Sequence, residues 1–279
     1  MVINNVWKVS FSLISHSCII QAKSVGGYNC HIDKPLVYDS TSRMPKVDVV
    51  VVALKTSMNY ILPSILPPLL RPDTIVLMTQ NGVYFEKELH SHFPNTAICG
   101  GVVYIAAKKT GPGHILHEEQ NFLKLVNWSA TASQMESISE DLQDAGLKNR
   151  EVPYADGRWG KALWNMVFNG LSVVTASSLQ EIFSNEKMMQ SAMAMIAEVL
   201  EAGKACGATT LNEKFVNTML DATRSMTHTT SMKEDYDRHN PLEIEYIYTR
   251  PIKEALKHGC RMPLVSMLEA QLLMLVNHR

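Results

Sequence analysis

One stretch of the chain carries polar side chains at a spacing that could do chemistry. Lys161, Asn165 and Asn169 recur every four residues in the otherwise apolar segment from Gly160 to Gly170. On an α-helix with about 100° per residue, Asn165 and Asn169 lie about 40° and 80° round from Lys161, so the three share one face. One cation and two amides suit a small, oxygen-rich ligand. By spacing alone, a solvated helix face is the more common explanation.

The first half of the chain alternates strands with helices. Buried apolar runs predict strands at residues 9–14, 49–54, 74–78, 97–104 and 122–126. Lys55 follows the second of these strands, and Asn81 and Gly82 come after the third. Ligands of open α/β sheets bind at the carboxyl ends of such strands. The pattern predicts an α/β fold, with a doubly wound, Rossmann-like parallel sheet over residues 1–153.

The second half is dominated by helix signals, which predict an all-helical domain over residues 154–279. Ser231 lies in a polar stretch, where a turn or cap residue is the simpler explanation. Glu243 lies at a helix start, where a partner for the helix dipole is the simpler explanation. A carboxylate close to Lys161 would change that interpretation, because each would favour the other's charged form. Pro251 is expected to kink or interrupt its helix.

Composition and charge narrow the class of protein. With 279 residues, 46% of them hydrophobic and 19% charged, the chain is typical of a soluble globular protein. Its net charge of -1 and the absence of a basic stripe predict no nucleic-acid partner and no membrane partner. The five cysteines are widely separated, which favours reduced thiols in a cytoplasmic protein. The histidines and cysteines show no metal-ligand spacing, so no metal site is expected.

A dinucleotide fold normally opens with a strand, a G-x-G-x-x-G turn and a helix whose N-terminus binds the pyrophosphate. The sequence contains no such motif. The strand at residues 9–14 would then be the second strand of such a fold. We therefore expect a sheet that is incomplete at its start.

Taken together, these features resemble the ketopantoate reductase family, the 2-dehydropantoate 2-reductases. The likeness is carried, in the family's order, by Leu54-Lys55-Thr56, Gln80-Asn81-Gly82, Gly100-Gly101-Val102, Gly111-Pro112-Gly113, Trp159-Gly160-Lys161, Asn165, Asn169, Ser231-Met232 and Glu243. The resemblance implies a Rossmann domain followed by a helical domain, with the active site in the cleft between them. It also implies NADPH-dependent reduction of 2-dehydropantoate, or a similar branched 2-keto acid, to the 2-hydroxy acid in pantothenate biosynthesis.

The resemblance implies a role for each matching residue. Lys161 would be the general acid that protonates the keto oxygen while NADPH delivers hydride. Glu243 would accept a hydrogen bond from the substrate hydroxyl and favour the charged form of Lys161. The other residues implied to bind substrate are Asn165, Asn169, Ser231 and Asn81. Those implied to bind the cofactor are Lys55, Asn81 and Gly82.

Two features, the residue at position 14 and the absence of the glycine-rich turn, leave alternatives open. Ile14 falls where many family members have an arginine suited to the 2′-phosphate of NADP, so NAD is an alternative cofactor. One rival hypothesis is a non-catalytic relative that keeps the substrate cleft but binds nicotinamide poorly. Another is a helical interaction module whose second half forms a homodimer.

Overall fold

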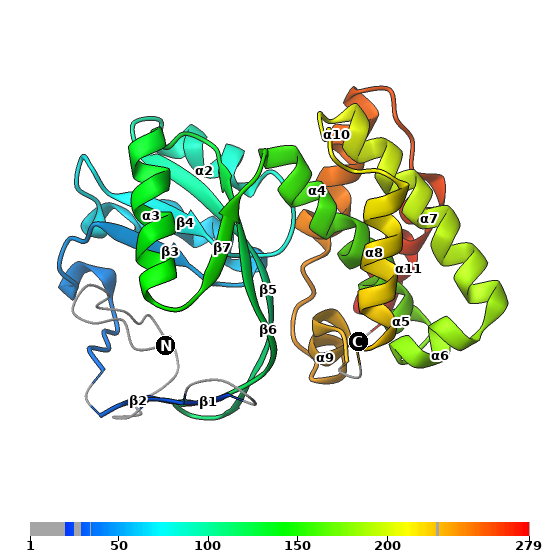
Figure 1. Ribbon diagram of the computed structural model, residues 1–279, viewed down its shortest axis with the longest axis horizontal. Coiled ribbons are helices and arrows are strands. Elements are labelled where there is room, and N and C mark those ends of the chain that lie inside the picture. Colours follow the sequence, from blue (N-terminus) through cyan, green and yellow to red (C-terminus); the bar gives the residue numbers. More distant parts are fainter. Residues whose placement is uncertain (1–19, 25–28, 34, 227–228, 279) are drawn as a thin grey trace. The chain divides into compact units, whose positions relative to one another are not determined.

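The computed structural model describes residues 20–24, 29–33, 35–226 and 229–278. These residues form two compact units (Figure 1). The first unit takes the described parts of Met1–Ala53, Tyr60–Gln80 and Leu89–Val152, and the second those of Leu54–Asn59, Asn81–Glu88 and Pro153–Arg279. Two segments that follow strands of the first unit therefore belong to the second. The predicted strand at residues 9–14, with Ile14, lies outside the described residues.

The first unit contains a single sheet. Its strands are β1 (Ile20–Ser24), β2 (Cys30–Ile32), β3 (Val49–Val52), β4 (Ile75–Met78), β5 (Ala97–Gly111), β6 (His114–Asn127) and β7 (Lys148–Glu151). They are ordered β2-β1-β6-β5-β4-β3, and β7 also pairs with β6. β3, β4 and β5 run parallel, with Val49 opposite Ile75 and Ile75 opposite Ala97. The predicted α/β fold and its parallel strands are confirmed, and β4 and the first part of β5 are buried. β3 is only partly buried at three of its four positions, because among the described strands it pairs with β4 alone, so the prediction of a buried strand is wrong there.

The sheet is also mixed, because its parallel strands continue into an antiparallel pair. β5 and β6 form a long antiparallel hairpin, with Cys99 opposite Asn127 and Gly111 opposite His114. Gly113, at φ +73°, lies in the turn that joins them. The sequence pattern predicted shorter strands, because the exposed residues near the turn interrupt the apolar run. Main-chain pairing continues the hairpin without an apolar pattern.

Helices of the first unit are short, apart from one. They are η1 (Thr41–Arg43), η2 (Thr56–Ile61), which continues from the second unit, α1 (Leu62–Ile65), η3 (Pro67–Leu69), α2 (Phe85–His92), which begins in the second unit, and α3 (Ala132–Asp144). Thr131 and Gln134 form a capping box at the start of α3. Its Met135, Ile138 and Leu142 pack into the core with side chains of the sheet (Figure 1).

The second unit is helical. Its elements are α4 (Tyr154–Trp164), η4 (Asn165–Asn169), α5 (Gly170–Val174), α6 (Leu179–Ser184), α7 (Glu186–Ala205), α8 (Glu213–Arg224), α9 (Ser231–Asp237), η5 (Glu245–Thr249), α10 (Arg250–Lys257) and α11 (Pro263–Asn277). α4, η4 and α5 follow one another without a break and form one central helix. Trp159, Leu163 and Phe168 of this helix are fully buried in the core of the unit.

Two turns of this unit, η4 and η5, are π-helical. In a π-helix each N–H bonds to the carbonyl five residues back, one residue further than in an α-helix. The prediction of a helix across Gly160–Gly170 is therefore right, but its hydrogen-bond period changes within that segment.

Pro251 does not interrupt its helix. The N–H of Arg250 donates to the carbonyl of Glu245, five residues back. In the same register the next donor would be residue 251, which as proline has no N–H. The carbonyl of Tyr246 instead accepts a hydrogen bond of 3.1 Å from the N–H of Val83. The π-helical turn thus accommodates the proline, and the released carbonyl binds the segment that follows β4.

Asp156 fixes the start of the central helix. Its carboxylate accepts hydrogen bonds from the backbone N–H groups of Thr209 and Thr210, at 2.9 and 2.7 Å, and from both hydroxyls, at 3.1 and 2.8 Å. Burial alone would raise the pKa of Asp156. The four hydrogen bonds to its ionised form outweigh burial and lower the pKa below its usual range. The helix that carries Lys161 therefore begins at a defined place.

Candidate active site

The amides of the central helix do not form a solvated face. Asn165 is 3% exposed and Asn169 is 1% exposed. Lys161, in the last turn of α4, is partly buried, and its Nζ lies 5.5 Å from the centroid of the Trp164 ring. The solvated-face explanation is therefore wrong for both amides, because neighbouring helices cover this side of the central helix.

The π-helical turn changes the direction in which Asn169 projects. In a continuous α-helix, Asn169 would lie about 80° round from Lys161. A π-helical turn contains more residues than an α-helical turn, so each residue of η4 advances by less than about 100° round the axis. Asn169 therefore lies closer to the direction of Lys161 than a continuous α-helix would place it.

Asn169 has an unsatisfied side chain. Neither its Oδ1 nor its Nδ2 has a hydrogen-bond partner among the residues that the structure describes. Leaving a buried polar group unpaired costs about 1–3 kcal/mol, and buried polar groups are nearly always paired. A ligand that both accepts and donates a hydrogen bond, such as a hydroxy acid, would satisfy this amide.

Glu243 lies two residues before η5 and is 7% exposed. Its Oε1 accepts hydrogen bonds from the backbone N–H of Thr56, at 2.7 Å, and from the Thr56 hydroxyl, at 2.8 Å. Its Oε2 lies 3.6 Å from Nζ of Lys55. Glu243 is thus a buried, positioned carboxylate and not simply a partner for the helix dipole. Its predicted effect on Lys161 stays a prediction.

Lys55 connects two carboxylates of the second unit. Its Nζ donates to Oδ2 of Asp235 at 2.5 Å, besides its contact with Glu243. Burial would lower the pKa of Lys55, but the charges and hydrogen bonds of Glu243 and Asp235 outweigh it and raise the pKa above its usual value. Sequence reasoning missed Asp235 and the adjacent Thr56. Asp235 follows Ser231 by four residues, one helical turn, a spacing that could have indicated it.

Ser231 is the first residue of α9, and it is exposed. The helix is capped by the preceding Thr230, whose Oγ1 accepts a hydrogen bond of 3.3 Å from the backbone N–H of Lys233. Thr230 is buried and bonds to the hydroxyl of Ser172 in α5 at 2.7 Å. The explanation of Ser231 as the cap is therefore wrong, and its role in binding substrate stays a prediction.

Asn81 and Gly82 begin the segment after β4. Gly82 has a φ of +112°, and a Cβ at this position would lie 2.7 Å from the carbonyl oxygen of Tyr246. Only glycine fits here, because any side chain would meet both backbone strain and a clash. Tyr84 also has a positive φ, +69°. This segment thus packs its main chain directly on η5.

A buried ion pair fixes the same segment to α4. Nε of Arg158 donates to Oε1 of Glu86 at 2.8 Å, and its Nη2 also binds that oxygen. The hydroxyl of Tyr154 donates to Oε2 of Glu86 at 2.8 Å. Glu86 is 0% exposed and Arg158 2%. Nε1 of Trp159 also donates to the hydroxyl of Tyr84, at 3.1 Å.

The predicted residues of the second unit therefore fall into connected groups. Lys55 and Glu243 contact each other directly, Gly82 contacts η5, and Lys161, Asn165 and Asn169 share the central helix. η4 of that helix packs against both η5 and α9. Cation, carboxylate and amide groups of this set suit the polarisation and protonation of a carbonyl-bearing acid.

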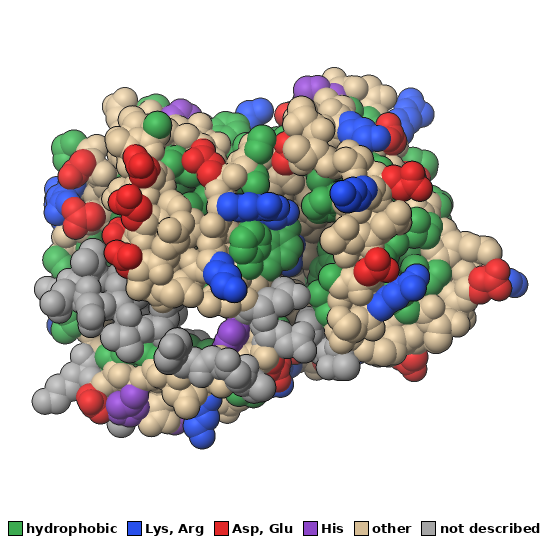
Figure 2. All heavy atoms as spheres, viewed as in Figure 1, with side chains coloured by type: hydrophobic (Ala, Val, Ile, Leu, Met, Phe, Trp, Pro, Cys, Tyr) green, Lys and Arg blue, Asp and Glu red, His purple; other side chains and the backbone are tan. Residues whose placement is uncertain are grey.

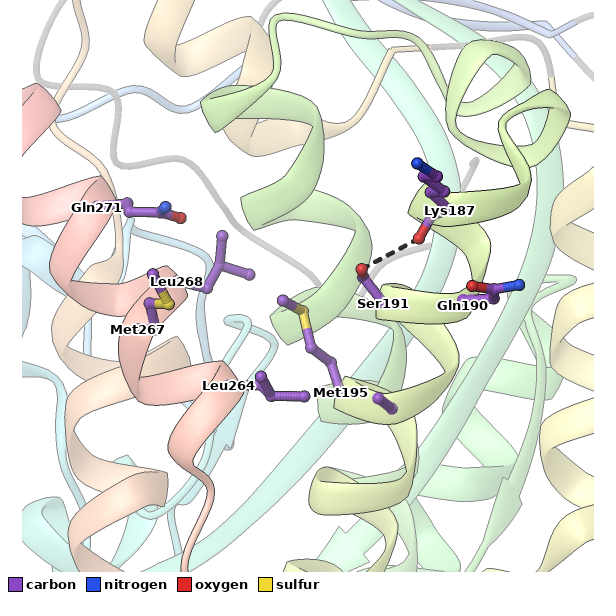
Figure 3. A pocket seen from close by; sticks show the side chains of 9 residues that line it. Lys187, Gln190, Ser191, Met195, Leu264, Met267, Leu268 and Gln271 are labelled. Carbon is purple, nitrogen blue, oxygen red and sulfur yellow. Dashed lines mark hydrogen bonds between the residues drawn. The ribbon is translucent and has the colours of Figure 1, made fainter.

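A groove of about 620 Å³ between α7 and α11 contains none of these residues (Figure 3). It is lined by Lys187, Gln190, Ser191, Ala194, Met195, Leu264, Met267, Leu268 and Gln271. The hydroxyl of Ser191 donates to the carbonyl of Lys187 at 3.1 Å. The groove offers an apolar surface and holds none of the predicted catalytic groups.

In the part of the chain that the structure describes, surface charge, metal-ligand clusters and long apolar helices do not indicate a second site. On the face shown in Figure 2, acidic and basic side chains are interspersed. Among the described residues, no cluster of three or more histidine, cysteine or acidic side chains could bind a metal ion. Within the same part of the chain, no helix combines the length and apolar character needed to span a membrane.

Known proteins place the chain in a family. The ketopantoate reductase PanE/ApbA family matches residues 16–130, and its C-terminal domain, ketopantoate reductase PanE/ApbA C terminal, matches residues 154–275. By class, the fold is that of the ketopantoate reductases, which are oxidoreductases that depend on a nicotinamide dinucleotide. The chain belongs to the ketopantoate reductase PanE/ApbA family.

Individual relatives agree. The 2-dehydropantoate 2-reductase of Nostoc sp. is 36% identical over 243 residues, which cover 84% of this chain and 76% of that protein. The crystal structure of 2-dehydropantoate 2-reductase from Geobacter metallireducens superposes with a TM-score of 0.85 at 26% identity, covering 91% of this chain and 86% of the other. A dimeric ketopantoate reductase from Staphylococcus aureus shares the fold, with a TM-score of 0.80 at 21% identity, covering 95% and 89%.

Proposed function

We propose that the chain is an NADPH-dependent 2-dehydropantoate 2-reductase. It would reduce 2-dehydropantoate, or a similar branched 2-keto acid, to the 2-hydroxy acid in pantothenate biosynthesis. The observation that carries the proposal is one helix with Lys161 at one end of a polar line and the buried, unsatisfied amide of Asn169 at the other. The Nostoc relative named for this activity supports it.

The residues of the second unit supply the proton and the binding contacts. Nζ of Lys161 donates a proton to the keto oxygen as the carbonyl carbon is reduced, which yields the hydroxyl of the product. Its positive charge stabilises the developing alkoxide until that transfer. Asn165 and Asn169 bind the oxygens of the substrate, and Glu243 accepts a hydrogen bond from the hydroxyl of the substrate. Ser231 binds its carboxylate or hydroxyl.

A reduced nicotinamide, when bound, supplies the hydride. Asn81 and Gly82 lie in a tight loop after a parallel strand, and Lys55 follows the neighbouring strand, so their amide, main-chain and cationic groups fit an amide- and phosphate-bearing cofactor. We assign dinucleotide binding to residues 1–153, and substrate binding with dimerisation to residues 154–279. Asn81 would contact both ligands.

Titration and turnover test this proposal. Adding NADPH or NADH to the purified chain should quench protein fluorescence saturably, with NADPH binding more tightly, and 2-dehydropantoate should then oxidise the bound NADPH. Saturable binding of neither cofactor would instead support the non-catalytic relative that keeps only the substrate cleft. Preference for NADH would contradict the assignment of NADP.

We also propose that the chain forms a homodimer. The outer side of α11 exposes Met267 at 63% and Met274 at 61%, beside the groove against α7. Exposed apolar clusters of this kind often mark interaction sites, and the S. aureus relative is dimeric. Light scattering after size exclusion should give twice the chain mass. A Met267→Glu, Met274→Glu variant should give the monomer mass, and a monomeric wild-type chain would contradict the proposal.

A further inference from the structure

Tyr248 of η5 is completely buried against the π-helical turn of the central helix. Its hydroxyl donates a hydrogen bond of 2.9 Å to the carbonyl of Met166 and lies 3.5 Å from the carbonyl of Asn165. Burial raises the pKa of this phenol far above its usual value, so the hydroxyl keeps its proton and is a donor at neutral pH.

These carbonyls belong to the turn whose hydrogen bonding has changed. A π-helical turn is a less favourable arrangement than the α-helix that flanks it here on both sides, and isolated π-turns are rare. A side chain that donates into the ladder of a helix is a known cause of such local departures. The hydroxyl of Tyr248 therefore stabilises η4 by a contact that a regular α-helix would not need.

The packing around the hydroxyl leaves no room for a side chain at position 170. A Cβ on Gly170, the first residue after η4, would lie 2.5 Å from the Tyr248 hydroxyl and 2.6 Å from Cδ2 of Leu268. Glycine at this position lets the phenol reach the main chain of the central helix.

We propose that Tyr248 is a positioning residue, whose hydroxyl maintains the π-helical turn of the central helix and thereby keeps Asn165 and Asn169 in line with Lys161. This inference rests on the proposed function, because it concerns the orientation of the two amide side chains proposed to bind substrate. Without the turn, Asn169 rotates away from Lys161, toward the displacement of about 80° that a continuous α-helix gives. The substrate would then lose contacts with an amide while the proton donor stayed in place.

Tyr248→Phe tests the inference, since it removes only the hydroxyl. Thr175→Val is a matched control, because the hydroxyl of Thr175 also donates to a carbonyl of the central helix, that of Leu171 at 2.7 Å, but outside the π-helical turn. Thermal unfolding of both variants first establishes that each is folded. Kinetics with the keto acid and amide hydrogen exchange of the central helix are then compared.

We expect Tyr248→Phe to raise KM for the keto acid about tenfold and to leave KM for NADPH unchanged. Amides of residues 165–170 should exchange faster in this variant. Thr175→Val should change neither quantity. A loss of stability alone would lower the unfolding temperature but would not separate the two KM values.

Different outcomes overturn different claims. If the wild-type chain reduces the keto acid and Tyr248→Phe has the wild-type KM, the positioning role is wrong while the proposed function stands. If amide exchange at residues 165–170 is unchanged in Tyr248→Phe, the hydroxyl does not maintain the turn, whatever the activity. If the wild-type chain neither reduces nor binds the keto acid, the proposed function is wrong and the substrate role of Tyr248 with it.

Discussion

Replacing Lys161 with alanine should lower kcat for keto-acid reduction by about 10²–10⁴-fold, the usual contribution of a general acid. The variant loses both the proton donor and the cation that stabilises the developing alkoxide. Its stability should change little, because the packing lost is a partly exposed stem and a cation–π contact worth about 0.5–1 kcal/mol. Steady-state kinetics at saturating NADPH, together with thermal unfolding, measure both effects.

Lys187→Ala is the matched control for this prediction. Lys187 is also a helix lysine of the second unit, but it lines the groove between α7 and α11. Its replacement should leave kcat within twofold of the wild type, which is the scatter expected of a remote surface change. If Lys161→Ala kept a tenth or more of the wild-type kcat, another group would have to be the acid.

Replacing Glu86 with glutamine should destabilise the second unit by about 3–5 kcal/mol, because the buried charge of Arg158 loses its partner. Glutamine keeps the shape of the side chain but not its charge, so the loss is electrostatic. Urea unfolding followed by tryptophan fluorescence measures it, since Trp159 and Trp164 both lie in this unit. The segment with Asn81 and Gly82 should loosen along with the pair.

Two comparisons separate the buried charge from general disruption. Glu201→Gln breaks an exposed pair with Lys204, whose atoms are 2.8 Å apart, and should cost less than about 1 kcal/mol. The double variant Glu86→Leu, Arg158→Met should recover much of the loss, because it leaves no charge unpaired. A small effect of Glu86→Gln would mean that water reaches Arg158 and that the pair does not fix the segment.

Several features of the site could be read from the sequence. Val49–Val52 is a run of four β-branched residues, which predicts a buried strand, and the polar residues after it are expected at a ligand-binding edge. The apolar positions around Lys161, Asn165 and Asn169 predict a helix with one side in the core, although not that the amides themselves are buried. Such patterns are local, so they need no knowledge of distant contacts.

Other features could not be read in this way. The hydrogen bond between Lys55 and Asp235 joins residues 180 positions apart, and that of Thr56 with Glu243 joins residues 187 apart. No spacing rule links such pairs. The hairpin of β5 and β6 was likewise underestimated, since main-chain pairing extends past the end of its apolar pattern.

By itself, the sequence determined which residue types stand where: the strands and helices, the lysine and amides of one helix, and a family likeness built on their order. Only the tertiary structure decided where those side chains point. Tyr248 donates to the carbonyl of Met166, and Pro251 withholds an N–H from η5. These contacts lie at the two π-helical turns, which residue spacing does not reveal. The physical reason is that the period of a helix depends on which hydrogen-bond partners the surrounding fold supplies, and those partners come from distant parts of the chain.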